Sequence, residues 1–393
     1  MIPFATRMDR LGTESAFEYL AKAKQLEAQG QAIVHLEIGQ PDFPTAPHIC
    51  TAAYEAMQAG YTGYGPAAGL PELRLAIAEH MADRPLAVNP EQVVVMPGAK
   101  PVIFFTMLAL VDPGDEVVYP DPGFPIYASV ANFVGAKPVP LPLRETVDFR
   151  FQLDDLRALV SERTKLLILN SPQNPTGGVL TPEDLAAIAD LAQRYDFYVL
   201  ADEIYSRILY DQAHHSIATY PGMAERTILL DGFSKTYAMT GWRLGYAVAP
   251  AAIAAKLTQL MINSNSCTCS FTQMAGVSAL QGSQVFVETM VAEFQQRRDR
   301  LVAGLNQIPG ISCRLPAGAF YAFPNVSQIT TDDKALADHL LTAAGVAVLP
   351  GSSFGAQGQG YLRLSYANSL ENIERAISRI GSALQGPNGF KAS

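Results

Sequence analysis

The sequence predicts an α/β fold, with a large domain built on a mostly parallel sheet flanked by helices and a smaller α+β domain built from both chain ends. From residue 92 onward, short apolar runs alternate with helical segments. Most runs are continuously apolar, as in strands of a parallel sheet that helices cover on both faces. Other helical and strand patterns lie near both chain ends. We assign residues 40–290 to the large domain and residues 1–39 and 291–393 to the small one.

Length and composition limit the classes of protein to consider. The chain has 393 residues, 49% of them hydrophobic and 17% charged, which suffices for two packed cores. The formal net charge is -9 and the basic residues form no run, so a nucleic-acid surface is not expected. No apolar stretch reaches the ~18 residues of a membrane span, and residues 1–10 lack a signal-peptide core. We expect a cytoplasmic protein, not bound to membranes, with a small-molecule substrate.

The cysteines are few and scattered. Cys50, Cys267, Cys269 and Cys313 form no disulfide framework and suit a reducing compartment. Cys267 and Cys269 have the one suggestive spacing, but metal sites usually need a second such pair or nearby histidines. We therefore expect no metal.

The N-terminal part is expected to consist of helices joined by loops. We expect helices over residues 15–30, 47–59 and 71–83, and a strand over residues 33–38. Ser15 is a candidate N-cap of the first helix, and Gly30 can end it. The loop 61–69 is rich in glycine and tyrosine and includes Tyr64. A loop of this composition seldom serves only as a connection.

The later part supplies the strands of the large sheet. We expect strands over residues 93–96, 117–119, 138–141, 166–169, 199–201, 227–230 and 246–249. The C-terminal region adds a packing helix over 284–306 and strands over 319–323, 346–349 and 361–365. In open α/β sheets, ligands bind beyond the carboxyl ends of the strands. The residues that follow each run are therefore the candidates for a functional site.

Residues that can bind a ligand or take part in catalysis follow five of the predicted strands. They are Gly98, Ala99 and Lys100 at a helix start, Phe124, Asn174, Asp202 with Tyr205, and Ser234 with Lys235 and Arg243. Each has an ordinary explanation when taken alone: a turn, a core aromatic residue, an Asn-Pro turn or a helix cap. Because all of them are expected at one edge of the sheet, we favour a shared functional site.

Lys235 is the central residue of this set. It lies among small residues, without a charged neighbour between Asp231 and Arg243. Desolvation disfavours the ammonium form of a lysine, and a neutral amine can attack a carbonyl and form a Schiff base. Ser234 and Arg243 offer a hydroxyl and a guanidinium of the kind that bind phosphate. The alternative is a strand and turn whose lysine reaches solvent.

These groups together match the needs of pyridoxal 5'-phosphate, an aromatic aldehyde with a phosphate group that proteins hold through a lysine. Asp202 at a buried strand end would keep the ring nitrogen protonated, and Phe124 would stack on the ring. The expected ligands of the ring oxygen and the phosphate are Asn174, Tyr205, Gly98, Ala99, Lys100, Ser234 and Arg243.

The same segments resemble the class I aminotransferases. Residues 232–245 are similar to the lysine signature of that family. The family's other blocks follow its order, at 97–100 (PGAK), 174–177 (NPTG), 202–205 (DEIY) and 361–365 (YLRLS). Segments 39–43 (GQPDF) and 64–73 (YGPAAGLPEL) make the prokaryotic branch of the aspartate aminotransferase family the most similar. The resemblance covers residues 15–370.

The resemblance implies transfer of an amino group from an L-amino acid to a 2-oxo acid. Lys235, Asp202 and Tyr205 would be the catalytic residues, and Lys235 would carry the α-proton of the substrate. The substrate carboxylate would bind Arg363, assisted by Asn174 and the backbone of Gly39. Tyr64 would reach the cofactor phosphate of the neighbouring subunit, which implies a homodimer with shared sites.

Two positions depart from the family pattern. Phe124 stands where relatives often carry tryptophan or tyrosine, and Phe17 where some aspartate-using relatives carry threonine. No second arginine for a distal carboxylate is identified, so the sequence does not establish an acidic substrate. Taken without the resemblance, Arg363 also fits the solvent-facing position of an alternating strand.

Two other functions fit the same fold. A β-elimination lyase acting on cysteine conjugates would use every residue named above. A non-catalytic binding module is disfavoured, because Lys235, Asp202 and Arg363 are all present.

Overall fold

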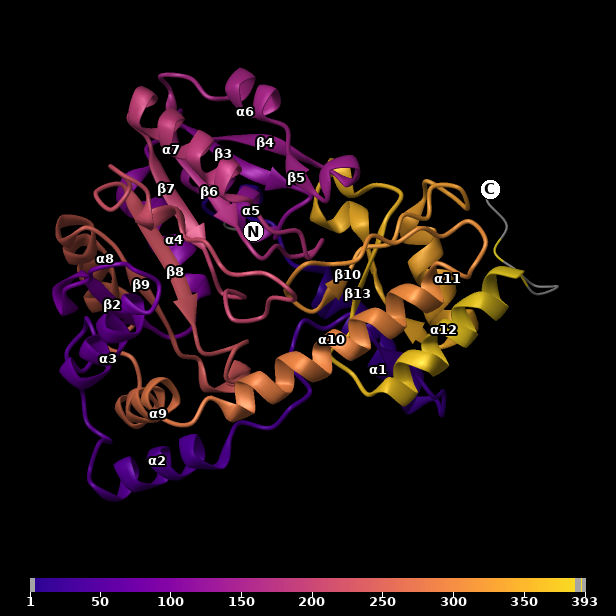
Figure 1. Cartoon of the computed structure of the whole chain (residues 1–393), viewed down its shortest axis with the longest axis horizontal. Helices are drawn as coiled ribbons and strands as arrows, with labels where there is room; N and C mark the ends of the chain where they lie inside the picture. The colour runs from indigo at the N-terminus through magenta and orange to yellow at the C-terminus, as the bar shows by residue number, and fades with distance from the viewer. Residues whose placement is uncertain (1–3, 386–389, 391–393) are drawn as a thin grey trace.

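The computed structural model describes residues 4–385 and residue 390, and its largest element is an eight-stranded sheet (Figure 1). The strand order is β2-β9-β8-β7-β6-β3-β4-β5. The strands are β2 (Val93–Met96), β3 (Glu116–Asp121), β4 (Lys137–Arg144), β5 (Arg150–Phe151), β6 (Thr164–Asn170), β7 (Tyr198–Asp202), β8 (Thr227–Gly232) and β9 (Gly245–Val248). The five strands from β8 to β4 pair in parallel, whereas β2, β9 and β5 pair antiparallel. A mostly parallel sheet is confirmed.

All seven predicted runs are strands of this sheet, and their continuous apolar character follows from burial on both faces. In β2, Val94 and Met96 pack into one core cluster, while Val93 and Val95 pack into another on the opposite face. The first cluster includes α4 (Lys100–Leu110), α5 (Ile126–Val134) and α8 (Ala251–Ser264). The opposite face is covered by α3 (Pro71–Ala82), α6 (Leu153–Leu159), α7 (Pro182–Tyr195) and α9 (Ser270–Gln281). The helix α2 (Pro47–Gln58) packs against α9.

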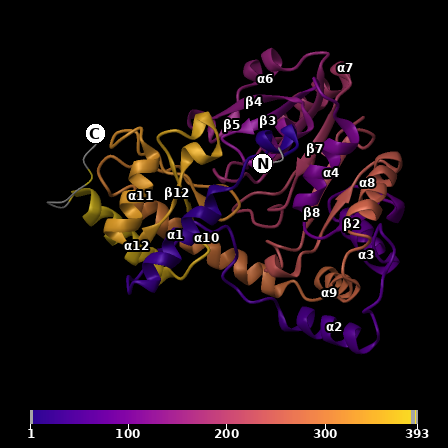
Figure 2. The same ribbon diagram turned by 180° about the vertical axis from the view of Figure 1, so that it is seen from behind.

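Segments from both chain ends lie together beside this sheet (Figures 1 and 2). β1 (Val34–His35) pairs in parallel with β11 (Val346–Ala347). A second small sheet has the antiparallel order β10-β13-β12. These strands are β10 (Tyr321–Ala322), β12 (Leu349–Pro350) and β13 (Leu362–Ser365), and the helices around them are α1 (Ser15–Ala28), α11 (Asp333–Ala344) and α12 (Leu370–Gln385).

The helix α10 (Val285–Leu305) runs from the large sheet to the helices of the chain ends (Figure 1). Met290 and Phe294 are fully buried in it, as the packing interpretation of this helix predicts. The division into residues 40–290 and residues 1–39 with 291–393 stays a prediction. Residues 1–3, 386–389 and 391–393 of the predicted small domain lie outside the described residues.

Two local predictions near the N-terminus are wrong in detail. Ser15 is the first helical residue, and Glu14 occupies the N-cap position without a side-chain cap bond. The strand predicted over residues 33–38 is only the two-residue β1. Beyond β1 the backbone turns toward other partners, because the carbonyl of Glu37 accepts from Arg363 and the carbonyl of Gly39 accepts from Lys235.

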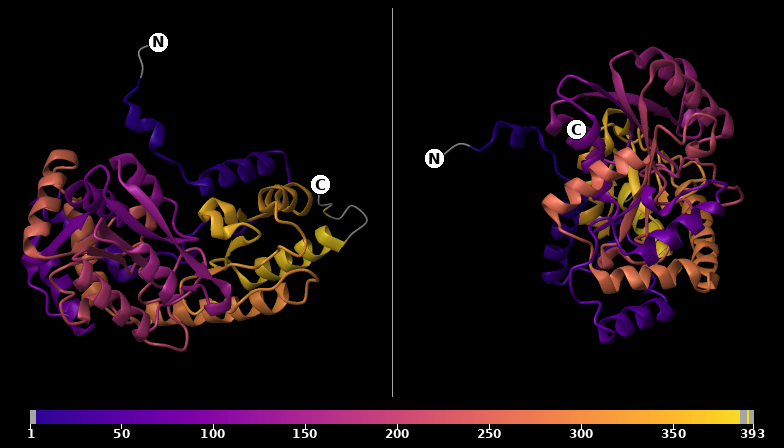
Figure 3. Two further views of the ribbon diagram at one scale, coloured as in Figure 1. Left: turned by 90° about the horizontal axis from the view of Figure 1, so that it is seen from above. Right: turned by 90° about the vertical axis from the view of Figure 1, so that its left-hand side faces the viewer.

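The N-terminal 3-10 helix η1 (Thr6–Arg10) extends away from the body of the molecule (Figure 3). Met8 within it and Phe4, which precedes it, are exposed. Among the described residues, no helix combines the length and the apolar character needed to cross a membrane.

Candidate active site

A cavity of about 510 Å³ lies where the carboxyl ends of β6, β7 and β8 meet the N-terminus of α4 and the strand β13. It gathers residues that are far apart in the chain. The predicted site residues that line it are Gly39, Ala99, Lys100, Phe124, Asn174, Asp202, Tyr205, Ser234, Lys235, Arg243 and Arg363. The residues expected at the strand ends of the large sheet therefore meet at one cavity.

One corner of the cavity is built for an anion. The backbone N–H groups at the start of α4 are free of helical partners, and Ala99 and Lys100 line the cavity there. Gly98 has φ +95°, and a Cβ on it would come within 2.1 Å of Nη2 of Arg243. Only glycine therefore allows the guanidinium to lie against this turn. With the hydroxyl of Ser234, the corner offers donors and positive charge suited to a phosphate.

Asp202 lies at the end of β7 with 5% of its surface exposed. Burial raises the pKa of its carboxyl to about 7, although a hydrogen bond from the Tyr127 hydroxyl (2.7 Å) and one from the backbone of Ile204 (3.2 Å) act in the opposite direction. Across the part of the chain that the structure describes, no lysine, arginine or histidine forms an ion pair with Asp202. A protonated ring nitrogen would supply the missing cation.

Lys235 follows β8 and faces the same cavity. Its Nζ donates a hydrogen bond of 2.5 Å to the carbonyl oxygen of Gly39. Removal of the amine from bulk water lowers the pKa of Lys235 to about 8, and the positive charges of Arg363 and Arg243 act in the same direction. A large fraction of this lysine is therefore neutral in mildly alkaline solution, as a nucleophile or a proton acceptor requires.

Arg363 lies in β13 with 4% of its surface exposed, so the interpretation of a solvent-facing arginine is wrong. Its Nη1 donates to Oδ1 of Asn174 at 3.0 Å, and its Nη2 donates to the carbonyl oxygen of Glu37. Within the described residues, its Nε has no hydrogen-bond partner and no carboxylate neutralises its charge. A buried guanidinium with a free donor is suited to binding a ligand carboxylate.

Two tyrosines of the site were missed in the sequence. Tyr127 lies three residues after Phe124 in α5, and its fully buried hydroxyl donates to Asp202. The hydroxyl of Tyr321 lies 2.7 Å from the hydroxyl of Tyr205, and its ring centre lies 4.5 Å from Cζ of Arg363. The segment 319–323 appears in sequence only as a strand. No local signal distinguishes a cavity-facing tyrosine from a core tyrosine there.

Two predicted site residues do not line the cavity. Gly98 lies against the guanidinium of Arg243 and leaves room for it, but is not itself part of the cavity lining. The side chain of Tyr64 is 94% exposed in this single chain, and its role toward a neighbouring subunit stays a prediction.

Comparison with known protein families shows the family of this chain. Residues 31–380 match the family described as aminotransferase class I and II. The chain belongs to this family. An aspartate aminotransferase of Pyrococcus abyssi is 41% identical over 382 residues, which cover 96% of this chain and 98% of that protein. The aminotransferase uses pyridoxal phosphate to transfer an amino group between an amino acid and a 2-oxo acid.

Solved structures of related aminotransferases have the same fold. The aspartate aminotransferase of Thermus thermophilus with maleate superposes with a TM-score of 0.93 at 37% identity, covering 97% of this chain and 99% of that one. An aromatic aminotransferase of Pyrococcus horikoshii gives a TM-score of 0.88 at 40% identity, covering 93% and 98%. The predicted α/β architecture of fold type I is thereby confirmed.

The cavity of this aminotransferase fits its cofactor. Stability alone explains three of its features poorly. They are a buried carboxylate without a cation, a lysine with a lowered pKa, and a glycine turn that leaves room for Arg243. A protonated ring nitrogen, an aldehyde carbon and a bound phosphate would satisfy the three features respectively.

Proposed function

We propose that this aminotransferase acts on L-amino acids with uncharged side chains, and that Lys235, Asp202 and Arg363 carry the reaction. The observation that supports the proposal is their convergence on one cavity, where burial lowers the pKa of Lys235 toward the neutral amine that its role needs. When bound, pyridoxal phosphate supplies an electron sink that makes the α-proton of an amino acid acidic.

Each residue then has a defined task. Lys235 holds the cofactor covalently and accepts and returns the α-proton at Nζ, for which the neutral amine is required. Asp202 keeps a proton on the ring nitrogen, and the hydroxyl of Tyr205 donates to the ring oxygen. Arg363 binds the α-carboxylate, assisted by Asn174 and the backbone of Gly39. The proposed ligands of the ring face and the phosphate are Phe124, Gly98, Ala99, Lys100, Ser234 and Arg243.

Product stoichiometry tests this function directly. Holoenzyme mixed with one amino acid, without a 2-oxo acid, should release about one equivalent of the matching oxo acid per subunit and then stop. A second oxo acid should restart turnover. Continuous release of pyruvate and ammonia from a cysteine conjugate, without an acceptor, would instead identify a β-elimination lyase.

Substitution of Arg363 should separate substrate binding from cofactor binding. For Arg363→Lys we expect KM for the amino acid to rise about 100-fold, because a lysine cannot form the bidentate pair with a carboxylate. The dissociation constant of pyridoxal phosphate should change less than about threefold. Steady-state kinetics and titration of the apoprotein with the cofactor measure the two quantities. An equal loss of both affinities would contradict the proposed role.

The mouth of the cavity indicates the substrate side chain. Lys100 lines it, but Nζ of Lys100 is already paired with a carboxylate oxygen of Glu14, from the segment before α1. Ala16, Phe17, Ile38, Ile103 and Phe124 supply apolar lining to the same cavity, and Nζ of Lys100 lies 5.4 Å from the ring centre of Phe124. A distal carboxylate would have to displace Glu14, whereas an apolar or aromatic side chain would not. This favours neutral side chains, although several relatives are aspartate aminotransferases.

Removal of the Glu14 charge should change this selectivity. For Glu14→Gln we expect kcat/KM for aspartate to rise about 10-fold relative to phenylalanine, since Lys100 would then be free to bind the distal carboxylate. Kinetics with both amino acids against the same oxo acid measure the ratio. Glu18→Gln, which removes a charge from the first turn of α1, four residues after Glu14 and outside the cavity lining, is the matched control. An unchanged ratio would refute the role of Glu14.

We propose further that the enzyme is a cytoplasmic homodimer. In the single chain, Tyr64 and the arm that carries Phe4 and Met8 are exposed, which supports a partner subunit covering them. Tyr64 would then reach the cofactor phosphate of the partner subunit. Four free cysteines support a reducing compartment.

A further inference from the structure

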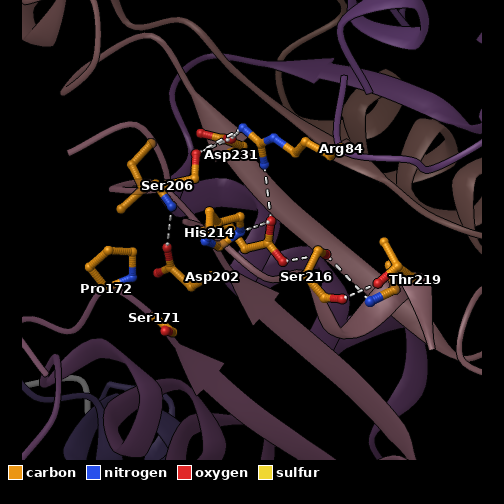
Figure 4. Close-up of polar contacts among 12 residues, drawn as sticks. Arg84, Ser171, Pro172, Asp202, Ser206, His214, Ser216, Thr219 and Asp231 are labelled. Carbon is orange, nitrogen blue, oxygen red and sulfur yellow. Dashed lines mark hydrogen bonds and ion pairs between the residues drawn. The ribbon is translucent and has the colours of Figure 1, made fainter. Parts of the chain in front are cut away.

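A cluster of buried charges lies behind the ends of β7 and β8, outside the lining of the cavity (Figure 4). We call it the Arg84 cluster, defined by Arg84, Glu203, Ser206, His214, Ser216 and Asp231. Arg84 comes from the turn after α3, and only 11% of its side chain is exposed. Figure 4 shows it pointing toward Asp231 and Ser206, with Asp202 on the far side of the cluster.

Arg84 is the bridge between two carboxylates. Its Nη1 donates to Oε2 of Glu203 at 3.0 Å, and its Nη2 to Oδ2 of Asp231 at 2.5 Å and Oγ of Ser206 at 2.8 Å. The side chains of Glu203 and Asp231 are 5% and 3% exposed. Burying three charges in this way gives little net stability, whereas removing one partner leaves an uncompensated charge. The cluster therefore calls for an explanation other than stability.

The remaining contacts keep Glu203 ionised. Burial acts to raise its pKa, but His214 Nε2 at 2.8 Å, Arg84 and the Ser216 hydroxyl at 2.6 Å together hold the pKa below the usual value. The pKa of nearby His80 is lowered by burial and by the charge of Arg84. His80 is therefore neutral at pH 7 and cannot take over the role of Arg84 as a cation.

The cluster is linked directly to the active site. Glu203 follows Asp202 in the chain, and its backbone N–H donates to the carbonyl oxygen of Leu230 in β8. Asp231 precedes Gly232 in β8 and accepts a hydrogen bond of 2.7 Å from its backbone N–H. The strand end that carries Asp202 and the strand end that leads to Lys235 are thus joined through Arg84. The negative charges of Asp231 and Glu203 both act to raise the pKa of Asp202.

We propose that Arg84 is a positioning residue for transamination, which joins the ends of β7 and β8 and cancels the charge that Glu203 and Asp231 would otherwise place beside Asp202. This inference rests on the proposed role of Asp202. Without the guanidinium, Asp202 retains its proton to higher pH. The ring nitrogen then loses its anionic partner in neutral solution.

The titratable neighbours define what the experiment must control. The groups that act on Asp202 are Tyr127 from α5, Tyr205 and Glu203 beyond β7, Asp231 from β8, and Lys235 beyond it. Arg84 interacts electrostatically with Asp231, Glu203, Tyr246, Tyr237 and His80. The tyrosines have raised pKa values through burial and stay neutral over the range from pH 6 to 9.

Arg84→Met and Arg84→Lys, compared with wild type, test the proposal. Apoprotein is titrated with pyridoxal phosphate from pH 6 to 9, with the fluorescence of the single tryptophan, Trp242, as the signal. For Arg84→Met we expect the pH midpoint of cofactor affinity to rise by about one unit, with about 10-fold weaker binding at pH 7. Arg84→Lys keeps the positive charge and should restore most of the wild-type profile.

A charge-matched variant separates electrostatics from packing. In Arg84→Met/Glu203→Gln/Asp231→Asn the cation and both anions are removed, so the midpoint should return to within about 0.3 units of wild type. Glu203→Gln alone, with Arg84 present, should lower the midpoint. An unchanged midpoint in folded Arg84→Met would overturn the inference. If Arg84→Met does not fold, the triple variant and Glu203→Gln decide the question. A pH midpoint above the wild-type value in the triple variant would overturn the inference. A pH midpoint that is not lower than wild type in Glu203→Gln would also overturn it.

The result also distinguishes this inference from the proposed function. Wild-type holoenzyme that releases no oxo acid from any uncharged amino acid would refute the proposed function. Normal release by wild type, together with an unaltered pH midpoint in Arg84→Met, would refute only the role of Arg84.

Discussion

Replacement of Lys235 by alanine is expected to reduce transamination at least ~10⁵-fold, because the variant loses both the covalent attachment of the cofactor and the base that moves the α-proton. The fold should stay intact, since the amine makes a single hydrogen bond to the described residues, with the carbonyl of Gly39. Turnover of an amino acid with a 2-oxo acid gives the loss of rate, and circular dichroism of the apoprotein gives the melting temperature. Turnover near the wild-type rate in the alanine variant would refute the mechanism.

The pH dependence of apoprotein stability provides a control for this prediction. The pKa of Lys235 is lowered from 10.5 to about 8, so the folded protein disfavours the ammonium form. The cost is present in full below pH 8, where both folded and unfolded lysine are charged, and disappears as pH rises toward 10.5. Lys235→Ala should therefore melt slightly above wild type at pH 7 and equal to it near pH 10.5. Lys235→Arg should be as inactive as the alanine variant, because a guanidinium does not become neutral.

The second large effect is expected for Asp202→Asn. Without the carboxylate the ring nitrogen is no longer held protonated, and we expect kcat to fall about 10³-fold or more with weaker cofactor binding. Stopped-flow measurement of oxo-acid release and equilibrium titration with the cofactor give the two quantities. The amide oxygen of asparagine can still accept from Tyr127, so the change removes mainly the charge. A loss of less than tenfold would contradict the assignment.

The same substitution should stabilise the apoprotein. The pKa of Asp202 is raised from 3.8 to about 7, so the folded state favours the protonated form. The stability that this preference contributes is present below pH 3.8 and is lost as pH rises through 7, where the buried carboxylate must ionise. At pH 8 the Asn variant should therefore melt above wild-type apoprotein, and the difference should shrink toward pH 4. Greater apoprotein stability combined with lost activity is the pattern expected of a functional group.

The large sheet was predictable because its strands are buried on both faces, which produces runs such as residues 93–96 and 166–169 without alternation. The convergence of Asp202 and Lys235 on one cavity was predictable because parallel strands place their carboxyl ends at one edge of the sheet. The extent of short strands such as β1 was not predictable, because the pairing of segments from the two chain ends, rather than the local sequence, decides where these strands end.

Arg84 shows most clearly what the sequence could not reveal. It stands in an Asp-Arg-Pro turn, where a charged residue is normally solvated. Its partners Glu203 and Asp231 lie 119 and 147 positions further along the chain. Tyr321 escaped notice for the same reason, because its partners come from distant parts of the chain: Arg363 lies in the neighbouring strand β13 and Tyr205 follows β7.

The three residues after Leu36 give the enzyme a preorganised cavity. Glu37 is held through its carboxylate by His35 of β1 at 2.7 Å, while its carbonyl accepts from Arg363 and the carbonyl of Gly39 accepts from Lys235. The short segment 37–39 thus holds both Arg363, which is proposed to bind the substrate, and Lys235, which is proposed to move its proton. We therefore expect a displacement of β1 relative to the large sheet to shift both acceptors together, and so to affect both proposed roles.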